Sequence, residues 1–179
     1  MTVPESPDLV SDDRWSSLAL VVGLSAAAAT HWGLTVLNGG VGNAFLHAPS
    51  LWMTGAFLVG ATQPQRSTAA EAGLVATTSG MAIYFGYFVL QGFAVRLPVV
   101  GLWVVVAVLV GAVFGLAGQS WWSATGRERG LGAALLIAAW LGQAAVMFGL
   151  YLRFVEPAIA SAAVGAGSGF CWVDAVGST

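Results

Sequence analysis

The stretch VVGLWVVVAVLVGAVFGLAGQSWW, residues 99–122, contains no charged side chain. A helix rises ~1.5 Å per residue, so ~20 apolar residues are enough to cross the ~30 Å hydrocarbon core of a bilayer. A run of this length has no polar face to offer to water. The stretch therefore predicts a helix that spans a membrane.

Four further apolar runs of similar length accompany this stretch. They cover residues 16–37, 43–62, 69–95 and 130–152. Only eight charged residues lie between Trp15 and Pro157, and they occur at or beside the breaks between the runs. We therefore expect an all-α fold, a polytopic transmembrane helix bundle with five spans and a sixth span that the sequence leaves open.

The composition excludes an ordinary soluble domain. Hydrophobic residues make up 58% of the chain and charged residues 8%, whereas a soluble domain carries ~25% charged residues. The net charge of −2 offers no basic surface for nucleic acid, which needs clustered positive charge. The lipid bilayer is therefore the partner that the composition predicts.

The chain divides into three parts. Residues 1–13 hold two prolines and four acidic residues, which predicts a disordered acidic tail. Residues 14–157 contain the predicted bundle. Residues 158–179 are weakly hydrophobic, because residues 158–173 consist mostly of Ala, Gly and Ser and are short for a span. We expect this segment to form either a partial sixth helix or an interfacial helix.

The arginines indicate the orientation. With a cytoplasmic N-terminus, four arginines lie in inner segments and two in outer segments, namely Arg14, Arg66, Arg127 and Arg129 inside, and Arg96 and Arg153 outside. This bias agrees with the positive-inside rule. We therefore expect a multi-pass protein of the cell (inner) membrane with its N-terminus in the cytoplasm.

The third apolar run carries a periodic stripe of small and polar residues. Its members are spaced by three or four residues and so share one face of a helix: Gly73, Thr77, Gly80, Tyr84, Tyr87 and Gln91. Lipid cannot satisfy phenol or amide groups, so the stripe is expected to face the bundle interior. It forms either a packing seam or the wall of a polar cavity that opens to the outer side.

The second apolar run is interrupted by Pro49. Proline inside a helix removes a backbone hydrogen bond and kinks the helix, so one interpretation is a kinked but ordinary span. The other is a short helix that begins near Pro49 and presents free N–H groups within the membrane. Together with the stripe, this predicts a ligand site formed by Tyr84, Tyr87 and Gln91, with His31, Asn38 and Asn43 nearby.

Small residues at helical spacing predict contact faces between helices. Gly111, Gly115 and Gly118 form one such face, and Gly142 and Gly149 belong to another. The residues expected of a metal site or an enzyme are not arranged for either role. His31 and His47 are sixteen residues apart with no flanking carboxylate, and the chain has no lysine. We expect no metal, no cofactor and no catalysis.

Three stretches carry a resemblance to a known family: residues 43–61, the triplet Gly86-Tyr87-Phe88, and VGAVFGLAG at residues 110–118. They resemble an uncharacterised family of small integral membrane proteins that is common in high-GC Gram-positive bacteria. The resemblance covers roughly residues 16–152. It implies a multi-span inner-membrane protein, suggests a sixth helix, and brings no assigned activity.

Two functions fit these observations. The first is a non-catalytic solute-binding or permease-type component with a polar-lined cavity toward the outer side. The second is a structural or assembly partner of another membrane protein, or a homo-oligomer, held by its Gly- and Ala-rich helix faces. A pocket containing Tyr87 and Gln91 favours the first function, whereas Gly111 and Gly115 exposed to lipid favour the second.

Overall fold

The computed structural model describes residues 13–36, 48–125, 127–151 and 155–177. In these ranges the chain forms helices and no strand, so the all-α expectation is confirmed. The elements in chain order are α1 (Asp13–Val36), α3 (Pro49–Ala61), α4 (Arg66–Leu90), α5 (Leu97–Ser123), α6 (Arg127–Gly142), the π-helix η2 (Gln143–Tyr151) and α7 (Val155–Gly177).

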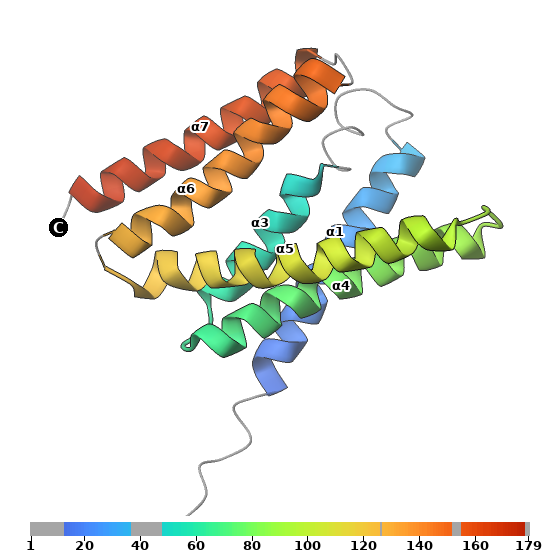
Figure 1. Ribbon diagram of the computed structural model, residues 1–179, viewed down its shortest axis with the longest axis horizontal. Helices are drawn as coiled ribbons and strands as arrows, with labels where there is room; N and C mark the ends of the chain where they lie inside the picture. Colours follow the sequence, from blue (N-terminus) through green and yellow to red (C-terminus); the bar gives the residue numbers. More distant parts are fainter. Residues whose placement is uncertain (1–12, 37–47, 126, 152–154, 178–179) are drawn as a thin grey trace, which may run out of the picture.

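The antiparallel pair of α4 and α5 forms the centre of the bundle (Figure 1). Helix α1 packs against α4, α3 packs against both α4 and α5, and α6 packs against α5. Helix α7 then runs back along α6 and η2. Two small cores join these layers. One lies between α1, α3 and α4, and the other, around Phe57 and Phe114, lies between α3 and α5.

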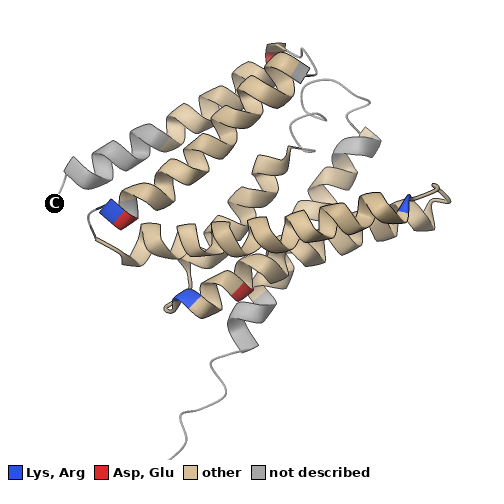
Figure 2. Cartoon of the chain, in the orientation of Figure 1, with Lys and Arg blue, Asp and Glu red and all other residues tan. Residues whose placement is uncertain are grey.

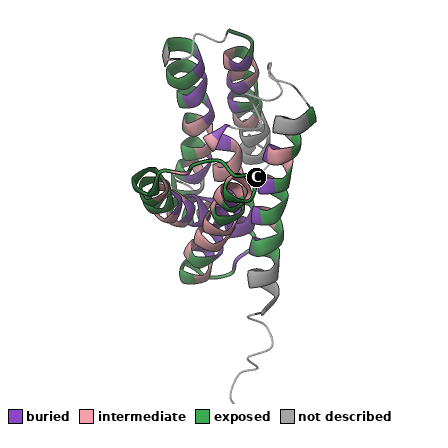
Figure 3. Ribbon diagram, turned by 90° about the vertical axis from the view of Figure 1, so that its right-hand side faces the viewer, coloured by how far each residue is buried: buried purple, intermediate pink, exposed green. Residues whose placement is uncertain are grey.

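Three helical segments are long and apolar enough to cross a membrane, namely Arg66–Leu90, Leu97–Ser123 and Gly130–Leu150. Many large apolar residues are exposed on the outside of the bundle, and the buried residues gather where helices meet (Figure 3). Along α5, one outward stripe is 36–63% exposed and consists of Leu102, Val105, Leu109, Val113 and Leu116. An aqueous solvent would strongly disfavour this stripe, whereas lipid accepts it.

The charged residues of the described chain lie near the helix ends (Figure 2). Arg66 and Glu71 lie in the first two turns of α4, Arg127 and Glu128 begin α6, Glu156 lies in the first turn of α7, and Arg96 directly precedes α5. Arg66 donates a hydrogen bond from Nη2 to Oε2 of Glu128 at 2.6 Å and so joins the N-termini of α4 and α6. Charges near the helix ends and apolar helix middles match the layered polarity of a membrane.

Helix α3 begins at Pro49. Ala48 has an extended backbone (φ −66°, ψ 122°), and the proline occupies the first turn, where its missing N–H costs nothing. The helix is therefore not kinked at Pro49 but begins there, as the short-helix interpretation predicted. With 13 residues, α3 is about 20 Å long at ~1.5 Å per residue. Residues 43–47 of the expected span lie outside the described residues.

Helix α4 ends at Leu90, earlier than the expected run to residue 95. Gly92 has φ +77°, a left-handed conformation that glycine adopts without steric cost. The Phe93 N–H donates to the Phe88 carbonyl, and the Gly92 N–H donates to the Val89 carbonyl, both at 3.0 Å. These two bonds form a Schellman motif, which closes the helix.

The last two elements refine the expectations for the C-terminal part. The run expected at residues 130–152 is continuous through Tyr151, the last residue described there, but it changes from α-helix to π-helix at Gln143. Helix α7 begins at Val155, has 23 residues and packs against α6 and η2. The expected boundary at residues 157–158 therefore falls within the first turn of α7, and the segment forms a sixth helix.

Glycines set the close approach of the central helices. A Cβ atom added at Gly111 or Gly115 would clash with the backbone of α4, and one added at Gly118 would clash with the Phe57 carbonyl of α3. The two glycines of the other predicted contact face, Gly142 and Gly149, do not pack against a neighbouring helix among the described residues. Gly142 is exposed with no atom within 4 Å of an added Cβ, and Gly149 is exposed with only Ala144 of its own segment nearby. In the described structure these two do not form a helix contact.

Candidate functional site

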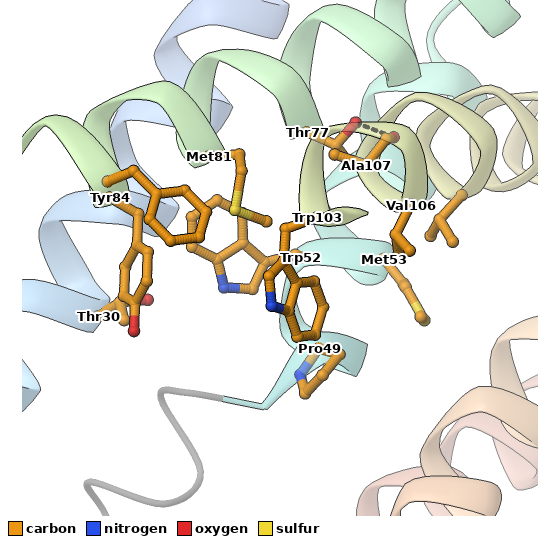
Figure 4. A pocket seen from close by; sticks show the side chains of 12 residues that line it. Thr30, Pro49, Trp52, Met53, Thr77, Met81, Tyr84, Trp103, Val106 and Ala107 are labelled. Carbon is orange, nitrogen blue, oxygen red and sulfur yellow. Dashed lines mark hydrogen bonds between the residues drawn. The ribbon is translucent and has the colours of Figure 1, made fainter. Parts of the chain in front are cut away.

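A cavity of about 260 Å³ lies between α1, α3, α4 and α5 (Figure 4). Its wall consists of twelve residues that carry no formal charge: Thr30, Pro49, Trp52, Met53, Thr77, Met81, Tyr84, Phe85, Trp103, Val106, Ala107 and Val110. Four of the twelve are aromatic and two are methionines, so the surface is apolar and adaptable. This composition is typical of small-molecule sites, which combine an apolar wall with a few polar groups.

The short helix α3 and a glycine of α4 together position Trp52. Trp52 lies in the first turn of α3, and its ring packs on Gly80, where an added Cβ would clash with the indole. The Tyr84 ring meets the Trp52 ring edge to face, with centroids 6.3 Å apart and an interplanar angle of 88°. A glycine at residue 80 is therefore required for the indole to reach the cavity.

Trp103 supplies the second indole of the cavity from the N-terminal part of α5. In Figure 4 both indole rings turn their nitrogen atoms toward the side of the cavity where Pro49 lies. Among the described residues, neither Trp52 nor Trp103 has a hydrogen-bond partner for its N–H. The cavity therefore presents two indole N–H donors on a mainly apolar wall, which also includes the hydroxyls of Tyr84, Thr30 and Thr77.

The threonine hydroxyls of the wall are already used in the structure. Thr77 Oγ1 donates to the Ala107 carbonyl of α5 at 2.8 Å, a bond drawn in Figure 4. Thr30 Oγ1 donates to the Ala26 carbonyl of its own helix at 2.9 Å. Thr77 thus acts as a contact between α4 and α5 at the floor of the cavity, and the predicted stripe serves as a packing seam in that part.

A groove of about 300 Å³ adjoins the cavity between α1 and α4. His31 and Tyr87 line it, with ring centroids 3.7 Å apart and an interplanar angle of 49°. Tyr84 lines both this groove and the cavity, so the two spaces adjoin at this residue.

A hollow of about 510 Å³ lies on the other side of α3, between α3, α5, α6 and η2. Here Gln143 Oε1 accepts a hydrogen bond from the Ser50 backbone N–H at 2.9 Å. The Leu51 N–H donates to the Ala48 carbonyl at 3.0 Å. These two N–H groups at the start of α3 are therefore satisfied within the protein, and they are not available to a ligand as the short-helix interpretation supposed.

The predicted ligand residues do not form one site. Tyr84 lines the cavity, whereas Tyr87 and His31 line the adjoining groove. Gln91 is exposed beyond the end of α4, because Gly92 terminates that helix. Asn38 and Asn43 lie outside the described residues. The stripe therefore divides into a packing seam around Gly73 and Thr77, a cavity wall at Tyr84, and a groove.

Sequence reasoning missed the two tryptophans that dominate the cavity. Membrane tryptophans favour the interface, where the indole N–H meets water. Trp103 fits this expectation, because it lies six residues after Leu97, the first residue of α5. Trp52 instead lies within an apolar run, and that position was the signal for a polar contact at its ring.

A comparison with known families assigns the chain to one of them. The model of a family of unknown function (DUF6518) matches residues 13–176. The chain belongs to this family. The resemblance to an uncharacterised family is thereby confirmed, and the match extends through α7. No curated protein and no solved structure matches the chain. The DUF6518 match brings no activity, so the functional argument depends on the cavity.

Proposed function

We propose that this DUF6518 protein is a non-catalytic integral membrane protein that binds a small, uncharged and mainly apolar solute, as a solute-binding or permease-type component. The observation that supports this is the aromatic cavity of about 260 Å³, whose lining carries no formal charge. An ion moved into such a cavity would lose its hydration without gaining a counter-charge. An uncharged ring system would instead gain contact with four aromatic side chains.

The proposal includes the orientation inferred from the arginines. With the N-terminus in the cytoplasm of the cell (inner) membrane, the C-terminal half of α4 and the N-terminal half of α5 lie in the outer leaflet. The cavity residues Tyr84 and Trp103 belong to these halves. The cavity then lies toward the outer side, where a solute enters from the outer leaflet or from the extracytoplasmic space.

Native mass spectrometry of protein purified in mild detergent from its own host tests this proposal. We expect a small uncharged molecule to co-purify with the wild-type protein. The Val106→Trp variant fills the cavity and should lose the molecule, because Val106 lines the wall. The Val105→Trp variant is the matched control, since Val105 is 56% exposed on the outside of the same helix.

Two results would contradict the proposal. Retention of the molecule by Val106→Trp at the wild-type level would place its site elsewhere. A wild-type protein that carries no small molecule, and takes up none from a panel of uncharged aromatic compounds, would remove the binding role.

An assembly partner is the second candidate function, and one observation favours it. The small residues Ala138, Gly142, Ala145 and Gly149 of α6 and η2 are exposed, and the first two line the hollow beside α3. Small residues allow a second helix to approach closely. The other predicted face is used within the chain, because Gly111 and Gly115 pack against α4. A stable homo-oligomer or a co-purifying membrane protein that is lost in Ala138→Trp would support this role.

A further inference from the structure

We propose that the solute of this cavity carries a hydrogen-bond acceptor, such as a carbonyl oxygen or a ring nitrogen, at the edge that faces Trp52 and Trp103. This inference rests on the proposed function and names the chemical class of its ligand. The ligand is thus an uncharged, flat or aromatic compound with an acceptor on one side. A pure hydrocarbon of the same shape fits the same volume but binds more weakly.

The argument begins with the environment of the two indole N–H groups. Both rings line the cavity, and neither N–H has a hydrogen-bond partner among the described residues. Trp52 is partly buried and Trp103 is 39% exposed, and an indole N–H that faces apolar surroundings without an acceptor is costly. Tryptophan N–H groups in apolar surroundings usually find an acceptor. The ligand is the group that can supply one.

The threonine hydroxyls of the wall do not compete for this role. The hydroxyls of Thr77 and Thr30 donate to backbone carbonyls at 2.8 Å and 2.9 Å. Met53, Met81 and Val106 offer only apolar contact. Since a donor needs an acceptor, a carbonyl or ring nitrogen is a better match to the two indoles than a second N–H would be.

The packing keeps the indole of Trp52 in place. Its ring lies on Gly80 and meets the Tyr84 ring edge to face at 6.3 Å. A rigid donor loses little entropy on binding, which favours discrimination between ligands that differ in one atom or group. The cavity should therefore distinguish an acceptor from an isosteric CH₂ group.

The test uses the full-length protein in detergent micelles and two probes of similar shape, 9-fluorenone with a carbonyl and fluorene with a CH₂ group. Binding is measured by isothermal titration calorimetry, with empty micelles as the blank. One net hydrogen bond contributes ~0.5–1.5 kcal/mol, which corresponds to about twofold to tenfold in Kd. We expect wild-type protein to bind fluorenone about twofold to tenfold more tightly than fluorene.

Conservative variants locate the effect. Trp52→Phe and Trp103→Phe keep an aromatic ring and remove the N–H, so their double variant should bind both probes with equal Kd. Trp122→Phe is the matched control, because Trp122 is 69% exposed at the far end of α5 and does not line the cavity. Size-exclusion profiles and thermal unfolding midpoints establish that each variant remains folded.

The outcomes separate the two proposals. Equal affinity of wild-type protein for fluorenone and fluorene overturns the acceptor inference and leaves cavity binding intact. A preference for fluorenone that persists in the double Phe variant also overturns it, since the donor must then lie elsewhere. Failure of the wild-type protein to bind either probe counts against the proposed function itself.

Discussion

At the residue scale, the junction of α3 with η2 depends on one side chain. Gln143 Oε1 accepts from the Ser50 backbone N–H across a separation of 93 residues in sequence. Gln143 Nε2 and Ser50 Oγ are buried with no partner among the described residues. The junction thus combines a hydrogen bond that caps α3 with two polar groups that gain nothing from burial.

This arrangement predicts opposite effects for two substitutions. Gln143→Leu leaves the Ser50 N–H buried without an acceptor and should lower the free energy of unfolding by ~1–3 kcal/mol. Ser50→Ala removes a buried hydroxyl that has no partner and should leave stability unchanged or slightly raised. Unfolding by SDS in mixed micelles measures both. A Gln143→Leu variant as stable as wild type would show that the cap contributes nothing.

The sequence predicted part of this residue-level structure. It offered a helix that begins near Pro49 as one of two interpretations, beside a span kinked at the proline. It did not indicate that Gln143 caps this helix, since the contact depends on how η2 packs against α3. The role of Tyr84 was predictable from helical spacing. The roles of Trp52 and Trp103 were not, because they depend on how α3 and α5 pack together.

At the scale of elements, the contact between α4 and α5 depends on glycine. An added Cβ at Gly115 would clash with the Ala69 carbonyl of α4. Gly115→Ala should therefore force the two helices apart and destabilise the protein by ~1–3 kcal/mol. Gly101→Ala is the control on the same helix, because nothing lies within 4 Å of its added Cβ.

Mixed-micelle unfolding of these two variants checks the prediction. Gly101→Ala should match or slightly exceed wild-type stability, since alanine favours the helix. Equal stability of Gly115→Ala and Gly101→Ala would contradict a close contact at Gly115. The sequence predicted this glycine face from its spacing. It also predicted one at Gly142 and Gly149, and spacing alone cannot tell which small residues a neighbouring helix covers.

At the scale of the whole molecule, polarity is arranged for lipid. The described charges lie near the helix ends. The outward stripe of α5 holds an apolar residue at each of its five positions, which are spaced by three or four residues. Run lengths and charge positions in the sequence predicted this arrangement, because both follow from the thickness of a bilayer. The cavity was not predictable in the same way, since its wall combines residues from four helices.

The central claim is that lipid surrounds the middle of this bundle, and a spin label on α5 tests it most directly. A nitroxide at Leu109, which is 62% exposed, is introduced as Leu109→Cys in a Cys171→Ser background. A label at Thr125, in the segment after α5, is the control. In reconstituted vesicles we expect the Leu109 label to be relaxed by oxygen far more than by a water-soluble nickel chelate, and the Thr125 label to show the reverse. Strong relaxation of the Leu109 label by the nickel chelate would contradict the account.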